Sequence, residues 1–164
     1  MEAQPYGPYG GPPAAEPQLP PLYLPTLIAA MVASVGIVIG SLGPWLTFLV
    51  FDRTATDGDG AITLVLGIIA TAALFVVLNL GRSRTNTGRM VGLSWVAITV
   101  GVVTFLIGVA DAVQVTSRKV DLFGRTVGPQ IGWGLWLVLI MSLVLIVTAG
   151  VVANQASKLK AGQR

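Results

Sequence analysis

The chain has 164 residues, of which 54% are hydrophobic and only 10% are charged, with a formal net charge of +3. Soluble domains carry about a quarter charged residues, so this composition excludes an ordinary soluble domain and favours an integral membrane protein. The chain contains no Cys and no His, which excludes disulfides, thiolate nucleophiles and Cys-based metal sites and removes the usual proton carrier at neutral pH.

The first 25 residues form a separate region by composition. Eight of them are Pro and three are Gly, and none is Lys or Arg. Such a segment cannot bury enough apolar surface to offset its ordering entropy, so residues 1–25 are predicted to be a disordered or strap-like cytoplasmic tail with polyproline II character. Two interpretations stay open: a strap that docks on a partner through Tyr6 and Tyr9, or a soluble spacer.

Four apolar stretches are long enough to cross a bilayer as helices. A hydrocarbon core of about 30 Å requires about 20 helical residues, and none of the stretches has a charge in its middle. The predicted spans are residues 26–45, 61–80, 90–113 and 131–153. They predict an all-α membrane protein, with a four-helix transmembrane bundle over residues 26–153 and a basic cytoplasmic tail over residues 154–164.

The first span carries Gly36 and Gly40 at a four-residue spacing and ends at a Gly-Pro pair followed by Trp45. Small residues at this spacing let two helices approach closely, so Gly36, Gly40 and Trp45 are predicted to be interface residues. Residues 46–51 are rich in strand-forming side chains. Either they continue the helix beyond the Gly-Pro kink, or they leave the bilayer as a short strand.

The stretch Asp57-Gly58-Asp59-Gly60 before the second span resembles half of a calcium loop. A complete loop needs later acidic ligands ending in a Glu, and no Glu follows Glu16. The stretch is therefore predicted to be a Gly-rich turn with Asp59 near the positive N-terminus of the second span, and no metal site is predicted.

Residues 114–130 connect the third and fourth spans. Apolar and polar side chains alternate over residues 113–116 and again over residues 120–122. This pattern predicts a small hairpin or two short extended pieces. Together with residues 46–51 they would form a small extracytoplasmic β cap. A two-stranded hairpin alone is marginally stable, so a third strand or a partner would matter.

The basic residues are distributed unevenly between the two ends of the predicted bundle. Six of them, with no acid, lie in the turn between the second and third spans and in the C-terminal tail, against four in the other two loops. By the positive-inside rule, both termini are predicted to be cytoplasmic, in a multi-pass protein of the cell membrane. These anchors account for the basic charge, so no nucleic-acid surface is predicted.

Aromatic residues mark the predicted outer ends of the first and fourth spans. Trp45, Trp133 and Trp136 fall there, and indole rings favour the headgroup level of a bilayer. Trp133 and Trp136 are predicted to anchor the protein among membrane lipids and to offer contacts to other integral membrane subunits. The alternative is that these two residues line a lipid or quinone site.

Asp111 is the one candidate for ionisable chemistry in a predicted span. It follows Met90 by 21 residues, which at 1.5 Å per residue places it about 30 Å along the helix, at the outer interface. It is predicted to pair with Arg118, Lys119 or Arg125. The alternative is that it handles an ion or a proton at the outer mouth of the bundle.

No catalytic constellation is visible in the sequence. Ser and Thr occur, but there is no His to activate them, and no nucleotide-binding fingerprint is present. The chain is therefore predicted not to be an enzyme and to have no catalytic residue, cofactor or metal. The leading hypothesis is a non-catalytic accessory or scaffold subunit of a larger membrane complex, and the alternative is a small oligomeric transporter or channel.

Several short motifs carry a resemblance. They are the Pro/Gly/Tyr-rich leader, Gly43-Pro44-Trp45, Thr56-Asp57-Gly58-Asp59-Gly60 and Gly132-Trp133-Gly134-Leu135-Trp136. In these the chain resembles small, mostly uncharacterised four-helix membrane proteins of actinobacteria, which occur as accessory subunits, for instance around mycobacterial respiratory supercomplexes. The resemblance implies an accessory role, with a respiratory supercomplex as one setting, and it brings no catalytic residues.

Overall fold

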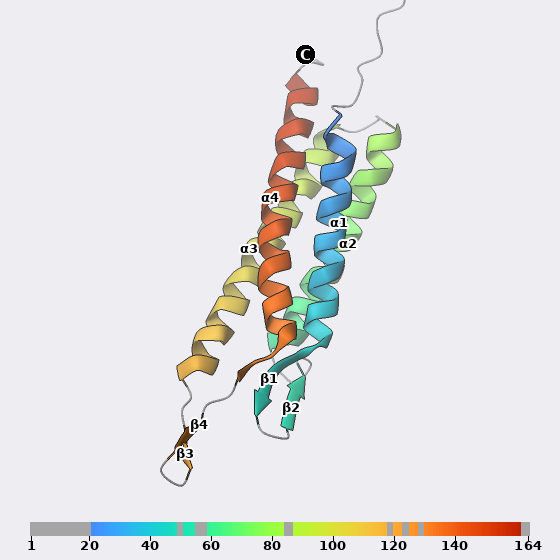
Figure 1. Cartoon of the computed structure of the whole chain (residues 1–164). Coiled ribbons are helices and arrows are strands. Elements are labelled where there is room, and N and C mark those ends of the chain that lie inside the picture. The colour runs from blue at the N-terminus through green and yellow to red at the C-terminus, as the bar shows by residue number, and fades with distance from the viewer. Residues whose placement is uncertain are drawn as a thin grey trace, which may run out of the picture.

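Four long helices form the main body of the described structure, a computed structural model (Figure 1). The residues described are 21–48, 51–54, 59–83, 87–117, 120–122, 125–127 and 130–161. The helices are α1 (Tyr23–Leu42), α2 (Asp59–Ser83), α3 (Thr87–Ser117) and α4 (Trp133–Ala161). Each contains a stretch long and apolar enough to cross a membrane, so the predicted four-helix membrane fold is confirmed.

The helices follow one another around the bundle. α1 packs against α2 and α4, and α3 packs against the same two neighbours, so α1 and α3 lie on opposite corners. Successive helices point in opposite directions, so the bundle runs up and down (Figure 1). The main core contains residues of all four helices, including Leu27, Leu74, Ala97 and Leu145.

The helix ends differ from the predicted spans for local reasons. α1 ends at Leu42 and not at residue 45, because Gly43 has extended backbone angles (φ −78°, ψ 168°) and Pro44 follows. α1 begins at Tyr23, inside the stretch predicted as a tail, and α4 continues to Ala161 through residues that hydropathy assigned to the basic tail. Hydropathy detects the apolar length of a helix, whereas a helix can extend beyond the lipid.

Residues 46–48 and residue 51 belong to short strands, and residues 49 and 50 lie outside the described residues. The described strands are β1 (Pro44–Phe48), β2 (Phe51–Thr54), β3 (Val120–Leu122), β4 (Arg125–Val127) and β5 (Gln130–Ile131). An antiparallel sheet has the order β2-β1-β5, and Leu46 of β1 pairs with Ile131 of β5. This sheet forms a β cap at the end of the bundle opposite the C-terminus (Figure 1).

Two details of the predicted cap are corrected. Residues 113–116 are not extended, because α3 continues through them to Ser117. Four alternating residues are too few to distinguish a strand from the side of a helix. The strands β3 and β4 do form the predicted hairpin, but among the described strands it stands apart from the cap sheet, whose third strand is β5.

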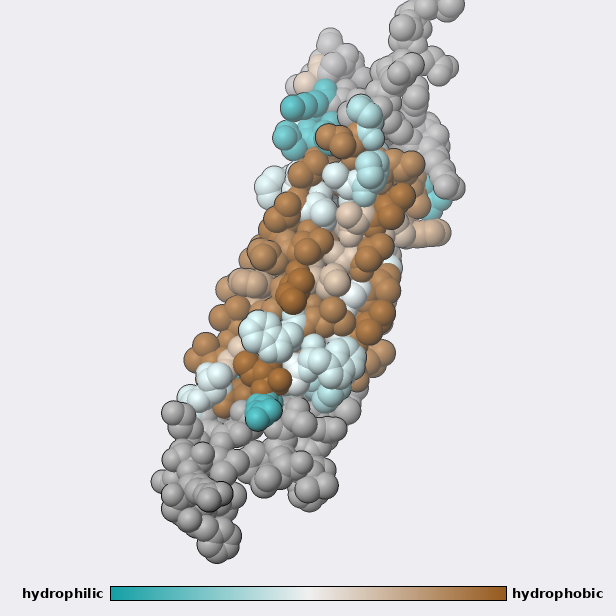
Figure 2. Space-filling view, in the orientation of Figure 1, coloured by the Kyte–Doolittle hydropathy of each residue, from teal (hydrophilic) through white to brown (hydrophobic). Residues whose placement is uncertain are grey.

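The outer surface of the bundle is apolar along the middle of its length, and more hydrophilic residues lie near its ends (Figure 2). Large hydrophobic side chains are exposed on every helix, for example Ile39, Phe75, Leu106 and Val147. Exposing such a surface to water is unfavourable, whereas lipid chains solvate it. The protein is therefore a multi-pass membrane protein whose helices contact lipid.

Candidate functional site

Gly36 and Gly40 bring α1 into close contact with α4. A Cβ atom at Gly36 would lie 2.7 Å from Cγ of Met141, and one at Gly40 would lie 2.9 Å from Cγ2 of Val138. The close helix approach predicted from the glycine spacing is therefore present, but it lies inside the chain. Both glycines are buried, so the prediction that this face contacts another subunit is corrected.

The same α1–α4 contact continues into the cap through Gly132 and Gly134. A Cβ at Gly132 would overlap the carbonyl oxygen of Pro44, and one at Gly134 would lie 2.7 Å from the carbonyl oxygen of Gly40. The backbone N–H of Gly132 donates to the carbonyl oxygen of Trp45 at 2.9 Å. The glycines of the first span and those that open the fourth span therefore meet where α1 packs against α4.

Trp45 closes the C-terminal end of α1. Its side chain is only 6% exposed, and its indole N–H donates to the carbonyl oxygen of Gly40 at 3.1 Å. The backbone N–H of Gly43 donates to the same oxygen at 3.2 Å. The carbonyl oxygen of Gly40 thus has two donors in place of the helical N–H that Pro44 lacks, and Trp45 is part of the core rather than an external contact.

Trp133 and Trp136 remain exposed at the start of α4. Each side chain is 55% exposed, and the ring of Trp133 lies over Gly43, where a Cβ would come within 2.7 Å of Cη2. Large, half-exposed indoles at the end of an apolar bundle suit the headgroup level of a membrane. Anchoring by these two residues and the alternative lipid or quinone site both stay predictions.

Two hydroxyl pairs join α1 to α2. Ser41 and Thr63 share a hydrogen bond of 2.8 Å, and the Thr71 hydroxyl donates to the Ser34 hydroxyl at 2.9 Å. Each of these hydroxyl groups also contacts a carbonyl oxygen of its own helix. Sequence reasoning did not identify these pairs, because a hydroxyl in an apolar span usually bonds its own preceding turn.

Thr104 is the exception among the fully buried polar side chains that the structure describes. These are Ser34, Ser41, Thr63, Ser94, Thr104 and Ser142. Each of the others has a hydrogen bond to a backbone or side-chain group, whereas Oγ1 of Thr104 has no hydrogen-bond partner within the described structure. A buried hydroxyl left unpaired is unfavourable.

The carboxyl group of Asp111 faces that of Asp59, at the cap end of the bundle. The two carboxyl groups are close enough to interact electrostatically, and like charges repel each other. Oδ2 of Asp111 is buried and has no hydrogen-bond partner among the described residues. Asp59 was expected as a cap of α2 and not as a neighbour of Asp111.

Several predicted site residues cannot be placed against one another. Tyr6, Tyr9, Arg118 and Lys119 lie outside the described residues, so the docking strap and the predicted ion pairs of Asp111 stay predictions. In the described ranges, no group of three or more His, Cys, Asp or Glu residues could hold a metal ion.

A shallow hollow of about 360 Å³ lies on α2 near its start. Its described lining consists of Ala61, Ile62, Val65 and Leu66. All four side chains are aliphatic, and they supply neither a nucleophile nor a proton donor. A hollow of this kind suits a hydrocarbon chain better than a polar substrate.

No protein-family model matches the chain, and no curated protein matches it.

Proposed function

We propose that the chain is a non-catalytic accessory or scaffold subunit of a larger integral membrane complex. The observation that supports this most is the use of the bundle interior. Gly36, Gly40 and Gly134 lie in close contacts between helices. Most of the buried hydroxyl groups form hydrogen bonds to backbone carbonyl groups or to one another. Such an interior stabilises a compact body, which then offers its outer surface and its leader for contact.

The contacts we propose are made by the exposed indoles of Trp133 and Trp136 and by the leader with Tyr6 and Tyr9. Half-exposed indoles bury a large area when a neighbouring subunit covers them. The resemblance to accessory subunits of actinobacteria makes respiratory complexes the first candidates for the partner. Both termini are proposed to be cytoplasmic, which places the leader and the cap on opposite sides of the membrane.

The experiment that tests this function removes the leader without damaging the bundle. Tyr23 begins α1 and is 2% exposed, so the deletion covers residues 2–20 only. A tagged chain is extracted from its native membranes in mild detergent, and its partners are quantified by mass spectrometry. We expect the deletion to reduce partner recovery at least several-fold, while the chain itself is recovered in normal amounts.

A matched variant separates the two interpretations of the leader. It replaces residues 2–20 by a Gly/Ser sequence of the same length, which keeps a flexible spacer but removes the Tyr and Pro side chains. If the leader is a docking strap, this variant loses partners as the deletion does. Full recovery of the same partners by both variants would show that the leader is no docking element.

One observation favours a second candidate function, a small oligomeric transporter or channel. Asp59 and Asp111 face each other at the cap end, and the buried hydroxyl of Thr104 lies two helical turns from Asp111 on α3. Intramembrane acids often mark an ion or proton path. This function requires proton or cation flux in liposomes, and the flux must change in Asp111→Asn but not in the control Asp121→Asn, which alters an acid of β3.

A further inference from the structure

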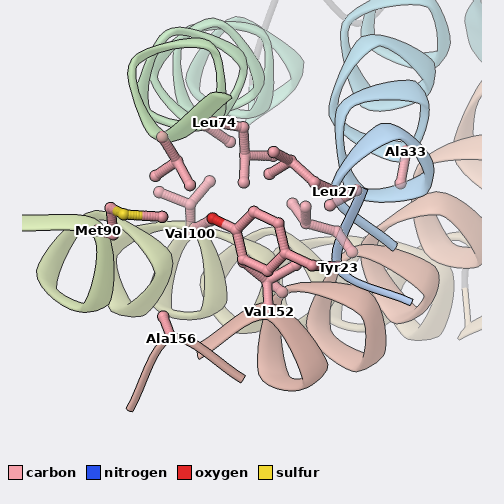
Figure 3. Close-up of a cluster of buried hydrophobic side chains, with 14 of the residues drawn as sticks. Tyr23, Leu27, Ala33, Leu74, Met90, Val100, Val152 and Ala156 are labelled. Carbon is pink, nitrogen blue, oxygen red and sulfur yellow. The ribbon is translucent and has the colours of Figure 1, made fainter. Parts of the chain in front are cut away.

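The first residue of α1 is inserted into the core at the end of the bundle opposite the cap. Tyr23 is 2% exposed, and its ring projects among side chains of other helices (Figure 3). The core cluster around it includes Leu27 of α1, Leu74 of α2, Met90 of α3, and Val152 and Ala156 of α4. A single side chain at the edge of α1 thus helps to hold this end of the bundle together.

The hydroxyl group of Tyr23 gains nothing from this position. Its oxygen is buried and has no hydrogen-bond partner in the described part of the chain, and the surrounding core side chains are aliphatic or carry a thioether. A Phe ring would bury the same apolar area without the desolvation cost of an unpaired hydroxyl. Packing alone therefore does not account for a Tyr at this position.

The turn that carries Tyr23 is held at its start by hydrogen bonds from Thr26 and not by a side-chain cap. Leu22 is the N-cap residue, and it makes no side-chain capping bond to the described helix. Pro25 has no N–H to donate. The backbone N–H of Thr26 donates to the carbonyl oxygen of Leu22 at 3.2 Å. The Thr26 hydroxyl also donates to the carbonyl oxygens of Leu22 and Tyr23, at 2.6 and 3.0 Å, so these carbonyls keep a local partner when a helical N–H bond breaks.

A second unpaired group lies at the same end of the bundle. Oε1 of Gln155, next to Ala156 in α4, is also buried with no hydrogen-bond partner within the described ranges. Near a helix end, water and lipid headgroups are close enough to pair with such groups once the local packing loosens. Opening of this end would therefore relieve polar groups that the closed bundle leaves unpaired.

We propose that the first turn of α1 is a latch with two states. In the closed state the Tyr23 ring is inserted in the core, as the structure shows. In the open state residues 22–26 unwind, and the Tyr23 hydroxyl reaches water or lipid headgroups. Ring burial favours the closed state and the unpaired hydroxyl opposes it, so the open state is populated more than a Phe would allow. The latch requires no particular partner.

Hydrogen exchange of the full chain in lipid nanodiscs tests this proposal. The variant Tyr23→Phe keeps the ring and removes only the unpaired hydroxyl. We expect the amides of Thr26, Leu27 and Ile28 to exchange about tenfold more slowly in the variant. The control Thr104→Val removes another unpaired buried hydroxyl, and it should leave the exchange of these three amides unchanged. Unchanged or faster exchange in Tyr23→Phe overturns the latch.

Thiol labelling gives a second readout that does not depend on amide exchange. The chain has no native Cys, so Leu27→Cys places a single thiol directly behind the latch, and Leu145→Cys places one in the middle of α4. We expect the thiol at position 27 to react faster than that at position 145, and to slow when Tyr23→Phe is added. Equal rates at both positions would contradict an opening at the start of α1.

Discussion

Single atoms decide the geometry at Gly132. Any side chain there would overlap the carbonyl oxygen of Pro44, whose chain is held by the hydrogen bond from Gly132 to Trp45. A glycine before the fourth span was visible in the sequence, but its role was not, because the obstructing atom belongs to a residue nearly 90 positions earlier. The spacing of glycines in a sequence indicates that another segment packs closely there, but it does not identify that segment.

We predict that Gly132→Ala destabilises the protein by about 2 kcal/mol, the usual scale of overpacking against rigid backbone. The thermal midpoint in detergent, followed by fluorescence-detected size exclusion, measures the loss. Gly92→Ala is the matched control, because a Cβ there meets no described atom within 4 Å. Ala in a helix is more favourable than Gly by about 0.5–1 kcal/mol, so the control should be as stable as the natural chain or slightly more so.

At the scale of elements, α1 is joined to its two neighbours by different devices. Glycines bring it against α4, whereas its contact with α2 combines two hydroxyl pairs with one glycine, Gly67, where a Cβ would lie 2.9 Å from Cγ2 of Val38. Hydropathy located all four helices, because a span is a property averaged over about 20 residues. It did not locate these devices or the facing of Asp59 and Asp111, since both depend on the rotation of one helix relative to another.

The Ser41–Thr63 pair is predicted to contribute a measurable coupling between α1 and α2. Ser41→Ala, Thr63→Val and the double variant form a double-mutant cycle. Hydrogen bonds between membrane helices average about 0.6 kcal/mol and reach about 1.7 kcal/mol, so we expect a coupling energy in that range from unfolding in mixed micelles. Additive single effects would show that the bond does not stabilise the contact.

For the strands too, composition indicated where strands could form but not which segments pair. Residues 46–51 were ambiguous in sequence because aromatic and β-branched side chains also occur in apolar helices. The Gly43–Pro44 step ends α1, and the chain then pairs with itself and with β5. The pairing with Gln130 and Ile131 joins segments more than 80 residues apart, which no local pattern specifies.

At the scale of the whole molecule, the number of spans and the proposed orientation are separate questions. The apolar helices establish a multi-pass membrane protein, whereas the cytoplasmic position of both termini rests on the distribution of basic residues. An even number of spans places both termini on one side in either orientation. Labelling from outside the cell therefore determines which side that is.

We predict that Thr87→Cys, at the start of α3, is shielded from a membrane-impermeant thiol reagent in intact cells, whereas Thr126→Cys, in β4, reacts. Detergent permeabilisation should make the first site reactive, and the natural chain, which has no Cys, measures the background. Labelling at position 87 and shielding at position 126 would reverse the proposed orientation.

The central claim is that this membrane protein acts through contact with other subunits and not through chemistry of its own. The most direct measurement is native mass spectrometry of the chain, tagged at its chromosomal locus and extracted without cross-linking. We predict a particle in which the 17.1 kDa chain is bound in fixed stoichiometry to different integral membrane subunits. A particle that contains only this chain and lipid, alone or as copies, would contradict the claim.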